Sequence, residues 1–428
     1  EGRPVQVTND PEEDMFPLWH PDGKRIIYTS DRAGRQEVFV ASLDGGKPFQ
    51  ITSGGSDRRA VAVSADGERL LLASTRDDAE IYGVETDTGR EFDVPQDIGW
   101  KIWPEVSPDG QMIAFHSSSN FEKLWKSSLI GRSTRAGASQ IQFASEGFNL
   151  SWSPAGDKLA FFRLAGGDIN IFTVNASGGA EKQLTTRGIF FRGYQYLPTN
   201  RYVREYSWSP DGGRIAYCSR PTGTVNVWTV NTDGLDDVQI TSNDDKNLIL
   251  YGPVWSPDGK LIAYVSETRP PGPDGKRVWS VRLAGKGSSE AIFQADKFAR
   301  IAGWVDSGNE LIVAVNEEDS EYPDYPQNPT VFGISPGGEH RVIVSLSSTY
   351  IATIQLSPDG RTLAFVSNRD GADNIWLVPV AGGEARRITL NADPRLYLAS
   401  PAWSPDGKAI YYSKQKRWNV ISMIDGFN

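Results

Sequence analysis

The chain has 428 residues, 39% of them hydrophobic, and a formal net charge of −10 at pH 7. This acidic balance argues against a nucleic-acid partner, which would require a basic face, and no apolar stretch approaches the roughly 18 residues of a membrane span. One cysteine, Cys218, excludes an internal disulfide. Because the start of the chain has no signal-peptide pattern, we expect a soluble mature protein or excised domain without direct membrane insertion.

The first predicted elements come from a short run of residues near the start. The sequence MFPLWHPDGKRIIYTS, which ends at Ser30, places one apolar run before the turn HPDG and a second run after it. The alternating run EVFVASL (37–43) and the run KPFQIT (47–52) follow, each after turn residues. Pro, Asp and Gly suit successive positions of a tight turn. Four short runs separated by turns predict four antiparallel strands.

Nearly the same sequence motif recurs along the whole chain. Nine copies of W-S-P-D-G or a close variant occur, and the run before each turn ends at Trp19, Val63, Val106, Trp152, Trp208, Trp255, Trp304, Leu356 and Trp403. Successive copies are 43 to 56 residues apart. A period in this range is typical of a repeat architecture. The Trp that ends most of these runs is expected to pack between neighbouring repeats.

The repeats predict one all-β domain over residues 1–428, a closed β-propeller of four-stranded antiparallel blades. We expect nine blades, with eight as the alternative. Their approximate bounds are 9–52, 53–95, 96–142, 143–185, 186–241, 242–294, 295–344, 345–389, and 390–428 together with 1–8. The ends indicate how the ring closes, since RPVQVT (3–8) resembles a fourth strand and NVISMIDGFN (419–428) a third. The N-terminal strand is therefore expected to join the C-terminal blade beside 417–424 and remove an exposed edge.

At this point the chain resembles a known family. The segments WSPDGKLIAYVS (255–266) and NIWLVPVAGGEARRIT (374–389) look like the repeat of TolB-like β-propellers. That repeat also occurs in bacterial sensor domains and in the propellers of prolyl-oligopeptidase-like enzymes. The resemblance implies a binding platform that grips partner proteins at the propeller face or channel, in the periplasm or outside a bacterial cell. TolB itself has six blades and an additional N-terminal domain, so the resemblance extends to the repeat and not to TolB's own partners.

A search for catalytic residues gives no convincing set. The three histidines, His20, His116 and His340, fall in different repeats, so we predict no metal site, and no cofactor motif is present. No nucleophile elbow of the α/β-hydrolase type is predicted. The aspartates of the repeated turn are expected to be structural: Asp22, Asp109, Asp211, Asp258, Asp359 and Asp406. The arginines that recur after the second run, Arg32, Arg76 and Arg369, are expected to form structural hydrogen bonds.

Long insertions point instead to a binding face. Three excursions, 186–206, 267–277 and 317–329, fall in successive repeats and on the same side of the predicted propeller. The first is rich in the aromatic and arginine residues that dominate protein interfaces. We therefore predict that a protein or peptide partner binds there, through Phe190, Arg192, Tyr194, Tyr196, Arg201, Tyr202, Arg204 and Tyr325, near Trp279. The competing interpretation is that 186–206 fills the channel of its own propeller.

Two other functions stay open from the sequence. A carbohydrate-active lyase or hydrolase would use carboxylates in the channel, and three or more converging acidic or histidine side chains would favour it. The chain could also be the sensor domain of a membrane-anchored receptor. A flat aromatic rim around a plugged channel would favour the non-catalytic binding protein.

Overall fold

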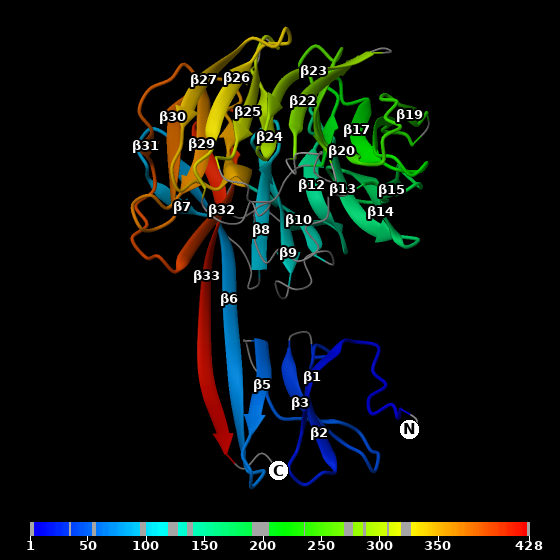
Figure 1. Cartoon of the computed structure of the whole chain (residues 1–428). Coiled ribbons are helices and arrows are strands. Elements are labelled where there is room, and N and C mark those ends of the chain that lie inside the picture. Colours follow the sequence, from blue (N-terminus) through cyan, green and yellow to red (C-terminus); the bar gives the residue numbers. More distant parts are fainter. Residues whose placement is uncertain are drawn as a thin grey trace. The chain divides into compact units, whose positions relative to one another are not determined.

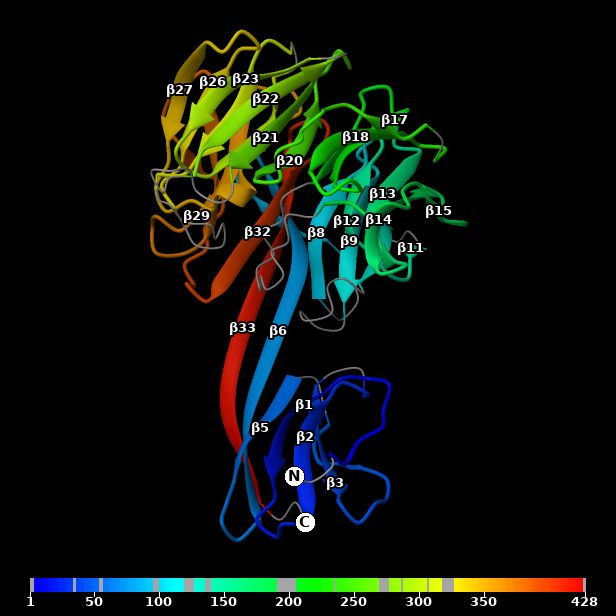
Figure 2. The same ribbon diagram turned by 45° about the vertical axis from the view of Figure 1, so that its right-hand side comes forward.

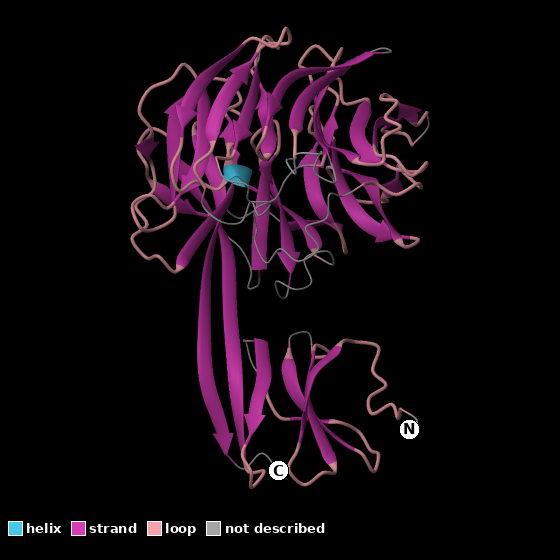
Figure 3. Cartoon of the chain, in the orientation of Figure 1, coloured by secondary structure: helices cyan, strands magenta, loops and turns pink. Residues whose placement is uncertain are grey.

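The computed structural model describes residues 4–33, 36–53, 57–94, 100–118, 127–134, 140–190, 205–234, 236–268, 277–285, 288–305, 308–317 and 327–425. Within these ranges the fold is all-β, as predicted, and the one helical element is the short 3-10 turn η2, Ile351–Thr353 (Figure 3). No helix among the described residues has the length and apolar character needed to cross a membrane. The chain forms two compact units. We call residues 1–78 and 415–428 the small unit, and residues 79–118 and 123–414 the large unit.

The small unit begins with the first repeat. Its four antiparallel strands are β1 (Asp14–Trp19), β2 (Arg25–Ser30), β3 (Glu37–Ser42) and β4 (Phe49–Gln50), in sheet order β1-β2-β3-β4. Strand β5 (Asp57–Val63) pairs with the first part of β6 (Arg69–Glu85). Ile27 and Val38 from the first sheet pack with Leu70 from the second. The predicted four-strand repeat is therefore confirmed here.

Six four-stranded antiparallel sheets of the large unit follow the repeat in chain order (Figure 1). Their strands are β8 (Trp100–Val106), β9 (Met112–Ser118), β10 (Ser128–Ser133) and β11 (Gln140–Ala144); β12 (Phe148–Trp152), β13 (Lys158–Ala165), β14 (Asp168–Asn175) and β15 (Lys182–Gln183); β16 (Tyr206–Trp208), β17 (Arg214–Ser219), β18 (Asn226–Asn231) and β19 (Val238–Gln239); β20 (Leu248–Trp255), β21 (Ile262–Thr268), β22 (Trp279–Gly285) and β23 (Ser288–Ala295); β24 (Ala299–Trp304), β25 (Leu311–Val315), β26 (Thr330–Ile334) and β27 (His340–Ser345); β28 (Gln355–Leu356), β29 (Thr362–Ser367), β30 (Asn374–Pro379) and β31 (Arg386–Arg387).

The remaining sheet combines the second and the ninth repeat. It contains β32 (Leu396–Trp403), β33 (Ala409–Asp425), β6 and β5 in that order, and β7 (Glu91–Asp93) pairs with β6. Both β6 and β33 are 17 residues long, because they continue straight where the other repeats turn between their second and third strands. The two strands run side by side in both views (Figures 1 and 2). Part of this sheet lies in the large unit and consists of β32, β7, the start of β33 and the end of β6. We call this part the composite sheet.

The repeated turn is held by its serine and aspartate. Ser256 donates its hydroxyl to Asp258 at 2.7 Å, and the same carboxylate accepts the backbone N–H of Lys260 at 3.1 Å. These hydrogen bonds lower the pKa of Asp258 to about 2. Gly259 takes the left-handed conformation with φ 69°, which a residue with a side chain adopts only with strain. Corresponding hydrogen bonds involve Asp22, Asp109, Asp211, Asp359 and Asp406, so the structural role predicted for the turn aspartates is confirmed.

A second network explains why a threonine follows the fourth strands, two residues after each ends. Thr241 donates its hydroxyl to the Asn226 side chain at 2.8 Å and accepts the backbone N–H of Val227 at 2.9 Å. The pairs Thr185–Asn170 and Thr389–Asn374 repeat this arrangement at 3.1 and 2.9 Å. The network ties the short fourth strand to the start of the third strand, so a two-residue outer strand stays attached.

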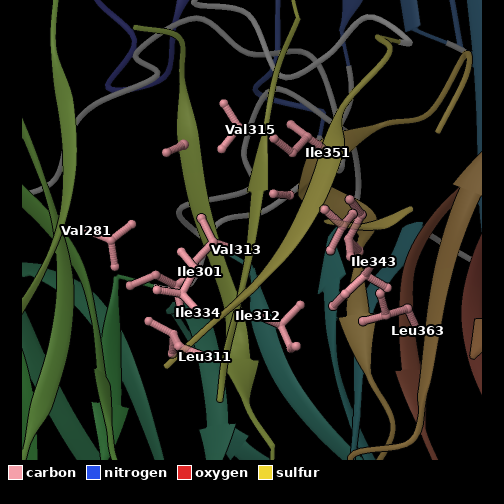
Figure 4. Close-up of a cluster of buried hydrophobic side chains, with 14 of the residues drawn as sticks. Val281, Ile301, Leu311, Ile312, Val313, Val315, Ile334, Ile343, Ile351 and Leu363 are labelled. Carbon is pink, nitrogen blue, oxygen red and sulfur yellow. The ribbon is translucent and has the colours of Figure 1, made fainter. Parts of the chain in front are cut away.

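Apolar clusters join each sheet of the large unit to the next. Figure 4 shows one that extends from β22 through β24–β27 to β29. Ile410 and Tyr412 of the composite sheet pack with Leu377 of β30, while Ile81 and Tyr411 pack with Ile113 of β9. Further clusters join the sheets in between. The contacts therefore pass through seven sheets of the large unit and return to the composite sheet.

The tryptophan that ends the first strand packs as predicted. Trp152, Trp208 and Trp304 are 7%, 9% and 8% exposed. Trp19 in the small unit differs, because 63% of its surface is exposed. Cys218 is also buried as expected, and burial raises the pKa of its thiol well above the usual value.

The predicted closure by the N-terminus is wrong. Residues 4–8 form no strand, and the strand neighbours of β33 are β32 and β6. The reason is that the third-strand segment of the ninth repeat does not fold back on its own second strand, so this structure lacks the blade that residues 3–8 would complete. The predicted count of nine four-stranded blades is not confirmed either, since the described residues form eight sheets.

Candidate functional site

The innermost strands of the large unit surround a cavity of about 270 Å³. It is lined by residues from sheets that are far apart in the chain: Glu105, Tyr206, Ser207, Tyr251, Gly252, Pro253, Val254, Val265, Arg300, Ile301, Ala302, Gly303 and Gln355. These residues come mainly from β8, β16, β20, β24 and β28, the first strands of five sheets. The cavity therefore lies where first strands of different sheets converge.

One repeat position supplies much of this lining. Glu105, Ser207, Val254, Gly303 and Gln355 each stand one residue before the end of a first strand, directly before Val106, Trp208, Trp255, Trp304 and Leu356. Because the repeat gives each sheet the same geometry, the same position of each first strand reaches the same cavity. The sequence varies this position freely, so each sheet contributes a different chemical group.

A bulge in the first strand shapes the wall beside these residues. Trp103, Gly252 and Ser400 have positive φ values of 54°, 60° and 53°, and a proline follows each of them. The pairing register shifts at this point in β8 and β20. Proline has no N–H to give to the ladder, so the pairing of β8 and β20 with their neighbours is interrupted beside the cavity.

A smaller cavity of about 50 Å³ adjoins the first. Glu105 and Gln355 line both, and Trp103, Ser400 and Pro401 line the smaller one. The two cavities share side chains, so we treat them together and call them the channel site.

Opposite charges and aromatic rings meet in the channel site. Arg300 is 7% exposed and donates from Nη1 to the backbone carbonyls of Ile351 and Ile354, at 3.3 and 2.9 Å. The Tyr206 hydroxyl lies 2.6 Å from the carbonyl oxygen of Asn149, which fixes its ring in the wall. Among the described lining residues, Glu105 is the one carboxylate and Arg300 the one guanidinium. The site can therefore accept a ligand with both polar and apolar parts.

His116 supports the wall from behind. Its ring stands edge-on to Trp103, with centroids 4.7 Å apart and an interplanar angle of 87°. Complete burial lowers the pKa of His116 to about 3, so the ring is neutral at physiological pH. Within the described ranges, no group of three or more His, Cys, Asp or Glu side chains could hold a metal ion. The converging carboxylates or histidines that would favour the hydrolase or lyase alternative are not found among the described residues.

The structure describes one of the predicted partner-binding residues. Phe190 is half-buried against an apolar cluster of β17, β18, β20 and β21, and its backbone N–H donates to the Cys218 carbonyl at 2.7 Å. Trp279, expected near the binding loops, is 1% exposed within β22. The other seven lie outside the described residues: Arg192, Tyr194, Tyr196, Arg201, Tyr202, Arg204 and Tyr325.

The recurrent arginines are structural, as expected for Arg32 and Arg369. Each donates from Nε to the serine two residues earlier, at 2.9 and 3.1 Å. Each also lies over an aromatic ring of the third strand, Phe39 at 4.8 Å and Trp376 at 4.6 Å. The sequence analysis missed these cation–π contacts. The side chain of Arg76 is outside the described part of the structure.

Known proteins resemble the chain over most of its length. It is 24% identical over 387 residues to dipeptidyl-peptidase 5 of Porphyromonas gingivalis, an alignment that covers 86% of this chain and 46% of that protein. It is 26% identical over 260 residues to the Tol-Pal system protein TolB of Francisella tularensis, covering 56% of this chain and 54% of TolB. The chain thus spans about half the length of these curated relatives.

A solved structure supports the fold. The β-propeller domain of the Trilobed protease from Pyrococcus furiosus superimposes with a TM-score of 0.52 at 12% identity, over 77% of this chain and 96% of that domain. Residues 1–136, 101–288 and 250–425 match the family model of the TolB beta propeller domain. The chain therefore belongs to the TolB beta propeller domain family.

Proposed function

We propose that this chain is a polypeptide-binding propeller, and that its channel site receives a short segment of a protein or peptide partner. The observation that carries the proposal is the convergence of first strands from five sheets on one cavity, with Glu105, Arg300 and two tyrosines in its wall. A peptide segment offers amides, apolar side chains and charges together. The site contains groups that complement each of them.

The bulges strengthen the case for a peptide. An extended peptide must find hydrogen-bond partners for its own backbone N–H and C=O groups. The bulge at Gly252 interrupts the pairing of β20 with β21, and Gly252 and Pro253 line the cavity. A peptide in the channel would lie along this main chain as well as along side chains.

The size of the site limits what enters it. A cavity of about 270 Å³ is slightly smaller than ligand pockets, which are typically about 300–1,000 Å³. It holds one or two amino-acid residues, so most of a protein partner would stay on the propeller face. The aromatic and arginine residues of the 186–206 insertion, with Tyr325, would contact that remainder.

The relatives support the same ligand class. A dipeptidyl-peptidase acts, by its name, on peptides, and TolB is named for the Tol-Pal system. A peptide-binding propeller would serve a non-catalytic partner protein, or it would hold peptide substrates for a catalytic domain. We propose the first role, in the periplasm or outside a bacterial cell, following the match to the TolB beta propeller domain family. Neither role changes what the channel site binds.

Binding of short peptides tests the proposal. Fluorescein-labelled pools of random hexapeptides, one basic, one neutral and one acidic, are titrated with the full chain and followed by fluorescence anisotropy. Glu105→Gln should weaken the basic pool about tenfold, since losing one desolvated charge pair costs about 1.4 kcal/mol. Glu384→Gln, an exposed carboxylate elsewhere, is the matched control. Equal affinities for both variants, or no peptide binding at all, would refute the proposal.

A further inference from the structure

The second and ninth repeats do not turn between their second and third strands. In repeats one and eight, the segments SDRAGRQE (30–37) and SNRDGADN (367–374) connect the second strand to the third through a turn. The corresponding segments STRDDAE (74–80) and SKQKRWN (413–419) are one residue shorter and contain no glycine, and they lie inside β6 and β33. The segments at the turn position of these two repeats are therefore extended.

Specific contacts hold the composite sheet together across more than three hundred residues of chain. Lys414 Nζ lies 2.7 Å from the Glu91 carboxylate and 4.2 Å from the centroid of the Tyr82 ring. The rings of Tyr82 and Tyr412 are 6.3 Å apart, and the backbone N–H of Thr86 donates to the Lys408 carbonyl at 2.9 Å. These contacts join the end of β6 to the start of β33.

The same strand segments have a second way to pair. The arrangement described here contains five strand pairings. The first half of β6 pairs with β5, the second half of β6 pairs with β7, the first half of β33 pairs with β32, and each half of β33 pairs with one half of β6. If β6 and β33 each folded back on themselves, as the second and third strands of the other repeats do, the segments would also form five pairings. The two arrangements thus contain equal numbers of strand pairings. They differ in two turns and in which sheets pack together. In proteins that switch folds, two packings of one sequence are close in free energy.

We propose that the chain exchanges between these two arrangements, the composite form described here and a self-paired form in which repeats two and nine each make their own sheet. In the composite form, the contacts of the large unit pass through seven sheets. In the self-paired form, all nine repeats would follow one another around a wider channel. The exchange is a conformational switch at one seam of the propeller. It goes beyond the proposed function and depends on no ligand.

One pair of residues distinguishes the two forms. In repeats with a turn, the serine that ends the second strand lies opposite the residue that starts the third, as in Ser219↔Asn226 and Ser367↔Asn374. The equivalent pair in repeat two is Ser74 and Glu80. In the composite form both are on β6, six residues apart, which is about 20 Å along an extended strand. A disulfide requires Cα atoms within about 7 Å, so only the self-paired form brings this pair into range.

The experiment uses the full chain carrying Ser74→Cys and Glu80→Cys, oxidised without denaturant and followed by mass spectrometry. The control is Ser117→Cys with Ser128→Cys, which face each other across β9 and β10. Cys218 stays in place because it is buried. We expect both variants to oxidise, the test pair at least about tenfold more slowly, since a minor state is typically populated below about 10%. Near-UV circular dichroism should show that the oxidised chain is folded.

A second measurement reports the composite form directly. Carbodiimide treatment of the unmodified chain should join the Lys414 amine to the Glu91 carboxylate, and Lys414→Arg should abolish that product. The product should also disappear once the Ser74→Cys/Glu80→Cys disulfide has formed. Exchange is ruled out if the test pair fails to oxidise while the control does, or if the oxidised chain still yields the cross-link. Absence of the cross-link from the unmodified chain would overturn the composite form.

Discussion

Trp152 donates its indole N–H to the backbone carbonyl of Glu105 in the preceding sheet, at 3.1 Å. Trp208 makes the same contact to Ser151 at 3.4 Å. The repeated tryptophan therefore does more than fill the space between sheets, because it holds the neighbouring first strand by its main chain. In the case of Trp152, that strand carries the carboxylate of the channel site. Packing of the repeat and positioning of Glu105 depend on one side chain.

Trp152→Phe should lower both stability and peptide binding. The change keeps an aromatic ring but removes the hydrogen bond, which contributes about 1 kcal/mol. Urea unfolding should show this loss, and the basic hexapeptide pool should bind more weakly. Trp19→Phe is the matched control, since that side chain is 63% exposed and surface changes stay within about 0.5 kcal/mol. Equal effects of the two substitutions would contradict the argument.

Thr241→Val should destabilise the sheet that carries it. The substitution preserves shape but leaves the buried Val227 N–H and the Asn226 side chain without the threonine hydroxyl. An unsatisfied buried polar group costs about 1–3 kcal/mol, which chemical denaturation can measure. Thr232→Val, at a partly exposed position of the same repeat, should change stability by less than about 0.5 kcal/mol. A neutral Thr241→Val would show that the outer strand does not need this network.

The turn aspartates should make the fold sensitive to acid. Hydrogen bonds to Ser256 and Lys260 lower the pKa of Asp258 to about 2, and the pKa values of Asp109, Asp211 and Asp359 are also lowered. A carboxyl whose pKa is lower in the folded than in the unfolded state contributes stability above its unfolded pKa of about 3.9, and this contribution is lost as pH falls through the folded value.

Unfolding by urea between pH 5 and pH 2 should therefore show falling stability. Asp258→Asn should reduce the slope, because one of the groups that must take up a proton is gone. Asp244→Asn, at an exposed position, serves as the control. A slope unchanged by Asp258→Asn would show that the turn carboxylate is not linked to folding.

His116 should make stability depend on pH in a second, higher pH range. Burial lowers its pKa to about 3, whereas an unfolded histidine titrates near 6.5. The unfolded chain therefore takes up a proton first, and stability falls below about pH 6.5 by as much as about 1.4 kcal/mol per pH unit. His116→Phe keeps an aromatic ring against Trp103 and should remove this part of the pH dependence. Thermal melts of both chains at pH 7.5 and 5.5 provide the measurement, and parallel shifts of the two would contradict it.

The repeat predicted local structure well because each element depends on neighbouring residues. The aspartate of the turn and the tryptophan before it act within one or two sheets, and their structural roles were predicted correctly. Which strands would pair with each other was not predictable in the same way. Tyr82 and Tyr412 lie in alternating runs that look like any other third or second strand, so the pattern could not reveal that they meet.

The channel site was missed for a related reason. Glu105 and Arg300 lie in short first strands without a motif of their own. The long insertions were predicted to bind a partner instead, because of their length and composition. A signal was present in the sequence, because Pro104, Pro253 and Pro401 each stand two residues before the last residue of a first strand. Proline at a fixed repeat position inside a strand indicates a bulge, and bulges are frequent beside binding sites.

The large unit should fold without the rest of the chain. The contacts that link its seven sheets use residues of β6 and β33 such as Ile81, Tyr82, Tyr411 and Tyr412, all of which lie between 79 and 414. A chain trimmed to residues 79–414 should therefore unfold cooperatively and bind the hexapeptide pools with the affinity of the full chain. It lacks the strands needed for the self-paired form, so the Glu91–Lys414 cross-link should form in at least the same yield. An aggregated or unfolded product would show that residues 1–78 and 415–428 are required to complete the propeller.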